Sequence, residues 1–561
     1  MTRATPSRMR EQVAANAYKR RWLILLVLNV SLLVIVVDNS ILNVAIPSIV
    51  NQLGASTSEL QWIVDSYTLV FAGLLLTAGS LGDRFGRLPA LQFGLTVFGL
   101  GSLLAALSDS SGQLIATRAF MGIGGAFIMP ATLSIIANVF PAPERGKAIG
   151  VWAATAGVAI ALGPLIGGFL LEHFYWGSVF LVNLPIVALG LLAGVFLIPD
   201  SKDPGAPKLD PVGAVASIVG LSLLLYAVIE APTEGWTATS TVSFFAAGAV
   251  VAAFFFWWEL HTDQPMLDLR FFKNPRFSAG SGAISAVFFA MFGSIFVLTQ
   301  YFQFVLGYSA LQTGVRLLAW AIPTMIVAPL SAKVVERIGT KLTISSGLSL
   351  VTVGLLLFTS VNETTAYFPG ILLRMVLMST GMALTMAPAT DAIMGSLPLA
   401  KAGVGSAVND TTRQIGGAVG VAIVGSVFTS VYASHLADGV RGDPIPPSAL
   451  DTAQEGIGNA FAVAAKLGGQ SGADLVVVAK SAFVDAFHVG LLVGAGVALV
   501  GAIAVLIWMP ARARREDVER QHLEYTREQS AFASPEQNGE EPVSAAAAPP
   551  RGTRGPTTDE R

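Results

Sequence analysis

Long apolar stretches separated by short polar connections fill the chain from residue 22 to residue 509. A helix of about 20 apolar residues is long enough to cross a hydrocarbon layer roughly 30 Å thick. Such a segment must be helical because lipid offers no partners for backbone polar groups. The pattern predicts fourteen membrane-spanning helices, at residues 22–46, 60–79, 89–107, 114–139, 147–170, 178–198, 211–230, 241–260, 277–304, 311–335, 341–360, 367–396, 401–432 and 481–509.

Basic residues in the connections predict the orientation of these helices. Every second connection carries lysine or arginine, and the short connections between them carry neither. Because cytoplasmic loops carry the excess of basic residues, we expect both termini on the cytoplasmic side of the cell membrane. The connection 433–480 then lies outside, and its three basic residues do not break the rule since long loops translocate largely regardless of charge.

Composition supports a membrane protein and narrows its partners. Hydrophobic residues make up 53% of the 561 residues and charged residues 12%, against about a quarter charged in soluble domains. A net charge of -2 gives no indication of a nucleic-acid partner. The chain has no cysteine, which excludes disulfides and thiolate metal sites. We expect no metal and no cofactor.

Two pairs of similar motifs indicate that the chain contains a duplication. The stretch "GDRFGR" is repeated about 255 residues later as "VERIGT", which aligns Asp83, Arg84 and Gly86 with Glu336, Arg337 and Gly339. "AFIMPAT" at 126–132 is likewise repeated as "LTMAPAT" at 384–390. Chance similarity between Ala/Gly-rich helices is the alternative. Two echoes in the same order argue against it, and transporters are often built from duplicated halves.

The repeat predicts an all-α integral membrane protein with two six-helix bundles and two intervening helices. Five segments follow from this division. They are a cytoplasmic segment (1–21), a first bundle (22–200), two intervening helices with their flanking loops (201–276), a second bundle (277–509) that includes the outer loop 433–480, and a tail (510–561) predicted to be disordered from its composition.

Three motifs resemble the major facilitator superfamily. Residues 79–91 are similar to its signature loop, although Leu88 stands where a basic residue is usual. "LIATRAFMGIGGA" from Leu114 resembles its fourth-helix motif, and "GPLIGG" at 163–168 resembles its fifth-helix antiporter motif. With fourteen spans, the chain is similar to the drug:proton antiporter branch that includes the quaternary-ammonium efflux pumps. Trp176-Gly177-Ser178 departs from that branch, which often has Trp-Arg-Trp there.

The resemblance implies gating residues. In the superfamily the signature loop latches the two halves together on the inner side, and its second copy forms a weaker mirror of it. Pro164 removes one helical hydrogen bond, and glycines allow close helix approach. Asp410 and Arg413 are three residues apart and form either a structural pair or part of the switch. The expected gating residues are Gly79, Asp83, Arg84, Gly86, Arg87, Gly163, Pro164, Gly167, Glu336, Arg337, Asp410 and Arg413.

Charged residues inside predicted spans suggest the coupling site. Asp38, Asp65 and Arg118 lie at similar depth, roughly 8 to 12 Å from the outer helix ends at about 1.5 Å per residue. Because two acids outnumber one base, we expect one carboxylate to lack a full partner and to bind and release protons. A structural salt bridge is the alternative. The resemblance implies that the helix 1 acid and the helix 4 arginine take part in coupling.

A candidate substrate site extends from these charges. Asp38 and Asp65 attract a cationic substrate when they are ionised. Aromatic and flexible side chains then line an adaptable pocket, although most aromatic residues in spans only pack. Asp391 is a candidate for receiving substrate from the cytoplasm. The expected lining residues are Trp62, Tyr67, Phe127, Met129, Trp152, Tyr301 and Gln303.

These features predict a proton-coupled antiporter that exports lipophilic, cationic compounds by alternating access. No G-x-x-x-x-G-K-[ST] loop is present, so nucleotide-driven pumping is disfavoured and an ion gradient must supply the energy. An exporter of an endogenous lipid or secondary metabolite on the same fold is the closest alternative. A membrane enzyme is disfavoured because the five histidines are scattered and form no H-E-x-x-H motif.

Overall fold

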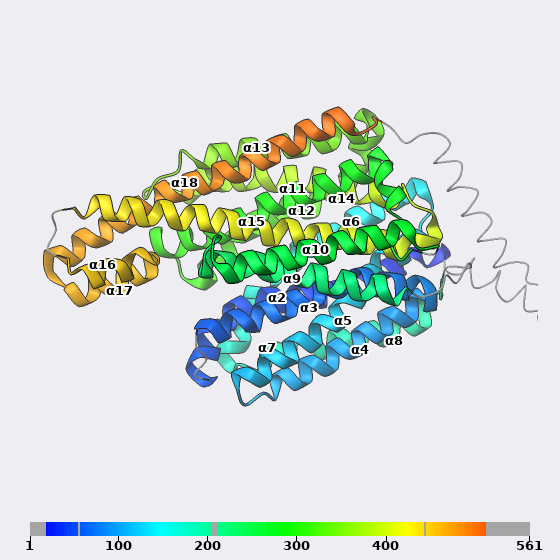
Figure 1. Cartoon of the computed structure of the whole chain (residues 1–561), viewed down its shortest axis with the longest axis horizontal. Coiled ribbons are helices and arrows are strands. Elements are labelled where there is room, and N and C mark those ends of the chain that lie inside the picture. The colour runs from blue at the N-terminus through cyan, green and yellow to red at the C-terminus, as the bar shows by residue number, and fades with distance from the viewer. Residues whose placement is uncertain (1–17, 54–56, 203–209, 264, 442–444, 512–561) are drawn as a thin grey trace, which may run out of the picture.

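The computed structural model describes residues 18–53, 57–202, 210–263, 265–441 and 445–511, and the predicted disordered tail lies almost entirely outside them. Every regular element in these ranges is helical. The helices lie side by side, and α16 and α17 lie at one end of the bundle beside the protruding ends of α15 and α18 (Figure 1). The long helices are α2 (Arg21–Leu53), α3 (Thr57–Phe85), α4 (Arg87–Ala106), α5 (Ser111–Val139), α6 (Ala142–His173), α8 (Asn183–Leu197), α9 (Pro211–Glu234), α10 (Thr239–His261), α11 (Pro275–Gln300), α12 (Ala310–Ile338), α13 (Thr340–Phe358), α14 (Leu372–Met394), α15 (Ala402–Gly439) and α18 (Gly469–Trp508).

These helices match the predicted spans. Within the described ranges, thirteen helical segments are long and apolar enough to cross a membrane, the shortest having 19 residues. One of them joins the short helix α7 (Ser178–Leu181) to α8. The remaining predicted span, 147–170, lies inside the 32-residue helix α6, which has sufficient length. The chain is therefore an all-α, multi-pass membrane protein.

The two pairs of repeated motifs lie at equivalent positions in the two halves of the fold. Gly86 joins α3 to α4 with φ +121°, and Gly339 joins α12 to α13 with φ +85°. Both glycines have the positive φ that residues with a Cβ rarely adopt, which explains why glycine stands at both positions. Pro130 inside α5 and Pro388 inside α14 are matched in the same way. The conformation thus supports a duplication.

The helices α2 to α8 form a first group and α11 to α18 a second; the two groups pack against each other, and α9 contacts both. Extensive contacts join α6 to α12 and α3 to α15. α9 and α10 form a pair, and α9 packs on α3 on one side and α15 on the other. The Nε1 atom of Trp236, in the α9–α10 connection, donates to Oγ of Ser426 on α15 at 2.8 Å. The intervening helices are therefore part of the packed bundle.

The connection 433–480 is a folded extension. α15 has 38 residues and α18 has 40, about 57 and 60 Å at 1.5 Å per residue, so both exceed a hydrocarbon layer of roughly 30 Å. Between them α16 (Pro447–Gln454) and α17 (Ile457–Leu467) pack together. The Phe461 ring of α17 meets Phe304 of the short helix η2 (Tyr301–Val305), which follows α11, with centroids 6.1 Å apart. Sequence analysis predicted only a long loop here.

Candidate functional site

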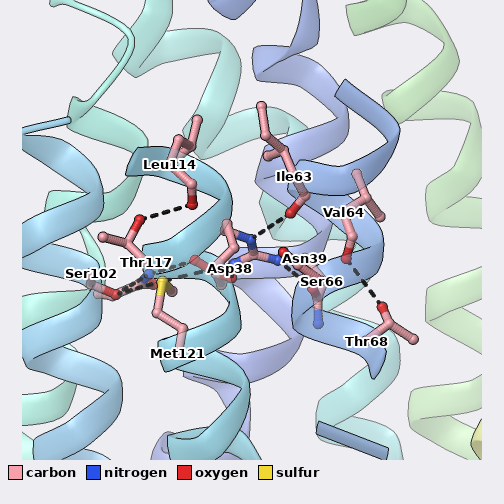
Figure 2. Close-up of polar contacts among 12 residues, drawn as sticks. Asp38, Asn39, Ile63, Val64, Ser66, Thr68, Ser102, Leu114, Thr117 and Met121 are labelled. Carbon is pink, nitrogen blue, oxygen red and sulfur yellow. Dashed lines mark hydrogen bonds and ion pairs between the residues drawn. The ribbon is translucent and has the colours of Figure 1, made fainter. Parts of the chain in front are cut away.

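A buried cluster joins four helices, α2, α4, α5 and α8, in the first helix group. Asp38 of α2 is 2% exposed, and Arg118 of α5 is fully buried. Nη1 of Arg118 donates to Oδ2 of Asp38 at 2.5 Å, while Nδ2 of Asn183, at the start of α8, donates to Oδ1 at 2.8 Å. Asn183 also donates to Oγ of Ser102 at 3.1 Å. Figure 2 shows Asp38 with Asn39 of α2, Ser102 of α4 and Met121 of α5 close to it. Both carboxylate oxygens of Asp38 therefore accept hydrogen bonds.

Arg118 ties a fifth helix, α3, into this cluster. Its Nε donates to the backbone oxygen of Ile63 on α3 at 3.2 Å, and its Nη2 donates to Oδ1 of Asn39 at 3.2 Å. The guanidinium also lies over the ring of Tyr67, 4.4 Å from the centroid. Because one guanidinium offers five N–H donors in a fixed plane, a single side chain holds α2, α3 and α5 together.

This pairing changes the expectation drawn from the sequence. The prediction that a central carboxylate lacks a full partner is wrong for Asp38, because Arg118 and Asn183 both reach it. Asp38 and Arg118 lie together as predicted. Asp65 lies two residues after Ile63 on α3, and its side chain is half-buried. The ion pair is thus the centre of the cluster, and Asp65 is the more accessible acid.

The predicted pocket residues divide into separate environments. Tyr67 and Trp152 are each 1% exposed; Tyr67 stacks on Phe71, and Trp152 donates its Nε1 hydrogen to Thr132. Tyr301 is fully buried and donates to the backbone oxygen of Asn362 at 2.7 Å. These contacts are those of packing residues. Half-buried members of the set are Trp62, Phe127, Met129 and Gln303; the Phe127 ring contacts Phe93, and the Trp62 ring contacts Tyr226 of α9.

The signature loop forms a buried latch between α3 and the start of α15. Oδ1 of Asp83 accepts from the backbone N–H of Gly403 at 2.8 Å, and Oδ2 accepts from that of Val404 at 3.0 Å. Arg87 donates to Oδ1 of Asp83 at 2.9 Å and to the backbone oxygen of Leu399 at 2.7 Å. A carboxylate at a helix N-terminus is stabilised by free N–H groups and the helix dipole. We call this end of the bundle the latch end.

Small residues allow the close approach that the latch requires. A Cβ atom on Gly79 would lie 2.6 Å from the backbone oxygen of Gly403. In α6, a Cβ on Gly163 would overlap Ser40 of α2, and one on Gly167 would lie 3.3 Å from Ile41. Gly163 therefore needs glycine for helix packing, whereas a Cβ at Gly167 requires only a small shift of the Ile41 side chain. Pro164 lies in α6 but outside the described side chains.

The remaining members of the gating set have different surroundings. Arg84 is half-buried, with its guanidinium 5.4 Å from the Phe85 ring. Glu336 and Arg337, aligned with Asp83 and Arg84, are both exposed. Within the described part of the chain, no ion pair joins them to the other helix group. The second copy of the loop therefore has no latch geometry like the first.

Asp391 forms an ion pair at the latch end. Nε of Arg145, near the start of α6, lies 3.2 Å from Oδ1 of Asp391 on α14. This ion pair bridges the two helix groups, and the Asp391 side chain is 29% exposed. From the sequence, Arg145 is expected only to orient the helices in the membrane. Its partner depends on how α6 meets α14, which no local pattern reveals.

Asp410 and Arg413 form a second buried pair, on α15. Nη1 of Arg413 lies 3.7 Å from Oδ1 of Asp410, and Nη2 donates to Oγ1 of Thr390 at 3.2 Å. The Arg413 guanidinium also lies 4.8 Å from the ring centroid of Trp152 on α6. The predicted three-residue pairing is confirmed, and a cation–π contact links it to the first helix group.

Asn183 is the site residue that sequence reasoning missed. Its amide satisfies Asp38 and Ser102 together. In the sequence, Asn183 stands inside the apolar stretch after Trp176. An amide buried there needs hydrogen-bond partners, and this position could have marked it as a site residue. The partners themselves depend on the folding of α8 against α2 and α4.

Comparisons with known proteins agree with this architecture. Residues 28–421 match the Major Facilitator Superfamily profile. Multidrug efflux pump LfrA of Mycolicibacterium smegmatis is 37% identical over 498 residues, 88% of this chain and 95% of that protein. Methyl viologen resistance protein SmvA of Salmonella typhimurium is 33% identical, over 88% of this chain and 99% of that protein. The tetracenomycin C resistance and export protein of Streptomyces glaucescens is 32% identical, over 90% of this chain and 95% of that protein.

Solved structures show the same fold. The human organic anion transporter MFSD10 (TETRAN) superposes with a TM-score of 0.52 at 14% identity, covering 90% of this chain and all of that one. A bacterial homolog of the human lysosomal transporter Spinster superposes with a TM-score of 0.51 at 18% identity, over 88% and 99%. The matched profile, the similarity to efflux pumps along most of the chain and the shared helical fold establish that this protein belongs to the Major Facilitator Superfamily.

Proposed function

We propose that this protein is a proton-coupled antiporter that exports lipophilic, cationic compounds from the cytoplasm or the inner leaflet. Relatives that match along most of the chain carry the names of multidrug efflux and resistance proteins. Methyl viologen, in the name of the Salmonella relative, is an organic dication. The basic connections favour a cell-membrane protein with both termini in the cytoplasm and the latch end facing inward.

The buried Asp38–Arg118 ion pair is the observation that carries the mechanism. A buried pair is favourable only while both charges are present, and removing one charge leaves the other without compensation. Protonation of Asp38 therefore weakens its hold on Arg118 and, through Arg118, the contacts with Ile63 and Asn39. A proton arriving at this position loosens the junction of α2, α3 and α5.

Cargo and proton then stabilise opposite conformational states of the transporter. Asp65, half-buried near Trp62 on α3, is the carboxylate we assign to a cationic cargo, and Asp38 is the proton site. Export gains energy when more protons enter than drug charges leave, at about 2.3 kcal/mol per charge for each 100 mV. The latch and the Arg145–Asp391 pair hold the inner side closed during one half of the cycle.

Uptake of a fluorescent lipophilic cation into inverted vesicles with an imposed pH gradient tests this function. We expect gradient-dependent uptake by the unmodified protein, its loss in Asp38→Asn, and weaker cation selectivity in Asp65→Asn. Asp109→Asn is the matched control because Asp109 is exposed in the α4–α5 connection. Gradient-independent uptake, or full uptake by Asp38→Asn, would contradict the proposal.

An exporter of a secondary metabolite is the second candidate. The Streptomyces relative is named for tetracenomycin C resistance and export. In the same vesicle assay, transport of a neutral polyketide without transport of cations would select this candidate.

A further inference from the structure

A small cavity lies between the end of α9 and the beginning of α10, at the end of the bundle opposite the latch. Its volume is about 150 Å³, and its walls include two glutamates, two aromatic rings and a threonine. These helices carry none of the residues assigned to coupling. The cavity is therefore separate from the Asp38 cluster.

Two carboxylates give this cavity its charge. Glu230 and Glu234 are four residues apart on α9, so they lie on the same helix face. In the described part of the chain neither glutamate forms an ion pair with a basic side chain; Oε2 of Glu234 accepts only a 3.4 Å bond from Ser240. Like charges at this spacing destabilise a helix, and a cation between them removes that cost.

Two aromatic rings complete the lining, one beside the carboxylates on α9 and one on α10. The rings of Tyr226 on α9 and Phe244 on α10 have centroids 4.6 Å apart, inclined at 61°. The Tyr226 ring also lies 5.8 Å from the ring of Trp62 on α3. Aromatic faces attract cations, most strongly organic cations that shed water readily. Among the described residues no group of three or more His, Cys, Asp or Glu side chains could hold a metal ion, and the aromatic wall favours an organic cation.

The hydroxyl of Thr241 supplies an independent sign of a ligand. Thr241 lines the cavity and is 2% exposed, and its Oγ1 atom has no hydrogen-bond partner among the described residues. A buried hydroxyl without a partner costs free energy, so such groups are nearly always satisfied. An N–H donor inside the cavity satisfies Thr241 directly.

We propose that Glu230, Glu234, Thr241 and the Tyr226 and Phe244 rings form a second site that binds a small protonated amine. The carboxylates balance the charge, the rings cover the alkyl part, and Thr241 accepts one ammonium hydrogen. The inference goes beyond the proposed antiport and does not require it, because the site lies on α9 and α10 and the coupling cluster on α2, α3, α5 and α8.

Equilibrium binding of butylammonium to the purified full-length protein tests the site. The measurement uses an Asp65→Asn background, so that binding at the carboxylate assigned to cationic cargo does not contribute. We expect Glu230→Gln/Glu234→Gln to weaken binding at least about tenfold, and Tyr226→Leu and Thr241→Val each about threefold or more. Asp451→Asn, which removes one acidic charge from an exposed position on α16, is the control and should leave binding unchanged.

Several results would overturn the site. These are unchanged binding in the double glutamine variant, equal loss in Asp451→Asn, or full displacement of butylammonium by sodium at the same concentration. Tyr226→Phe keeps the ring and should bind normally, which separates loss of the ring from misfolding. Butylammonium binding that persists while vesicle transport fails would reject the antiport proposal and leave this site standing.

Discussion

The carboxylate of Asp83 accepts the backbone N–H of Gly403 at 2.8 Å, joining residues 320 apart in the chain. Because Gly403 lies in the first turn of α15, the carboxylate caps a helix of the other group. The same oxygen binds Arg87, which reaches the backbone of Leu399. Side chains of one loop thereby bind two backbone N–H groups of α15 and the backbone oxygen of Leu399, just before α15.

Removing the Asp83 charge should open the latch end. In Asp83→Asn, the buried Arg87 loses its counter-ion, at a cost of about 3–5 kcal/mol to the closed form. The chain has no native cysteine, so spin labels at Lys147→Cys and Lys333→Cys, on α6 and α12, report the separation of the groups. We expect a longer-distance population in Asp83→Asn and none in Asp451→Asn. Identical distance distributions in both would show that the latch does not hold this state.

A bulky residue at Gly403 should prevent closure sterically. A Cβ there would lie 2.6 Å from both the Gly79 backbone oxygen and Oδ1 of Asp83, and the backbone oxygen cannot move aside alone. Gly403→Val is therefore expected to shift the same spin-label distances and to reduce transport. Gly496→Val is the control, because an added Cβ at exposed Gly496 meets nothing within 4 Å. A closed Gly403→Val protein would contradict the close packing.

Asp38 and Arg118 should show strong energetic coupling. Each single change, Asp38→Asn or Arg118→Gln, leaves a buried charge without its partner and should lower the free energy of unfolding by about 3–5 kcal/mol. The double variant leaves neither charge and should cost clearly less than the sum, with coupling near about 3 kcal/mol. Denaturant unfolding in detergent measures the cycle. Additive effects would mean that the pair contributes no mutual stabilisation.

Asp200 should make stability depend on pH near the latch. Partial burial raises the pKa of this carboxyl, which follows α8, above its ordinary value, against the opposing effect of bonds from the backbone of Ser201 and Leu88. Ionisation then costs more in the folded than in the unfolded chain, so stability falls as the pH rises through the pKa. Asp200→Asn should raise the melting temperature at pH 8 and change it little at pH 3. A larger gain at pH 3 would reverse the assigned sign.

Local sequence features determined the spans, the repeat and the latch motif. Hydrophobic length alone predicts a membrane helix, because lipid imposes the same requirement on every segment. The aligned motifs also paired Gly86 with Gly339. This pairing could be predicted because a backbone position with positive φ favours glycine whatever its tertiary surroundings. The folded helices α16 and α17 were missed, since short helices outside lipid carry no such length signal.

Partnerships between distant residues were decided only by the tertiary structure. The sequence placed Asp38 and Arg118 at one depth, but the meeting of α2, α5 and α8 gave Asp38 two partners instead of too few. The same holds for Arg145 with Asp391 and for the Glu230–Thr241 cavity, whose members are unremarkable until two helix faces meet. Hydropathy depends on each segment by itself, whereas charge pairing depends on which faces come into contact.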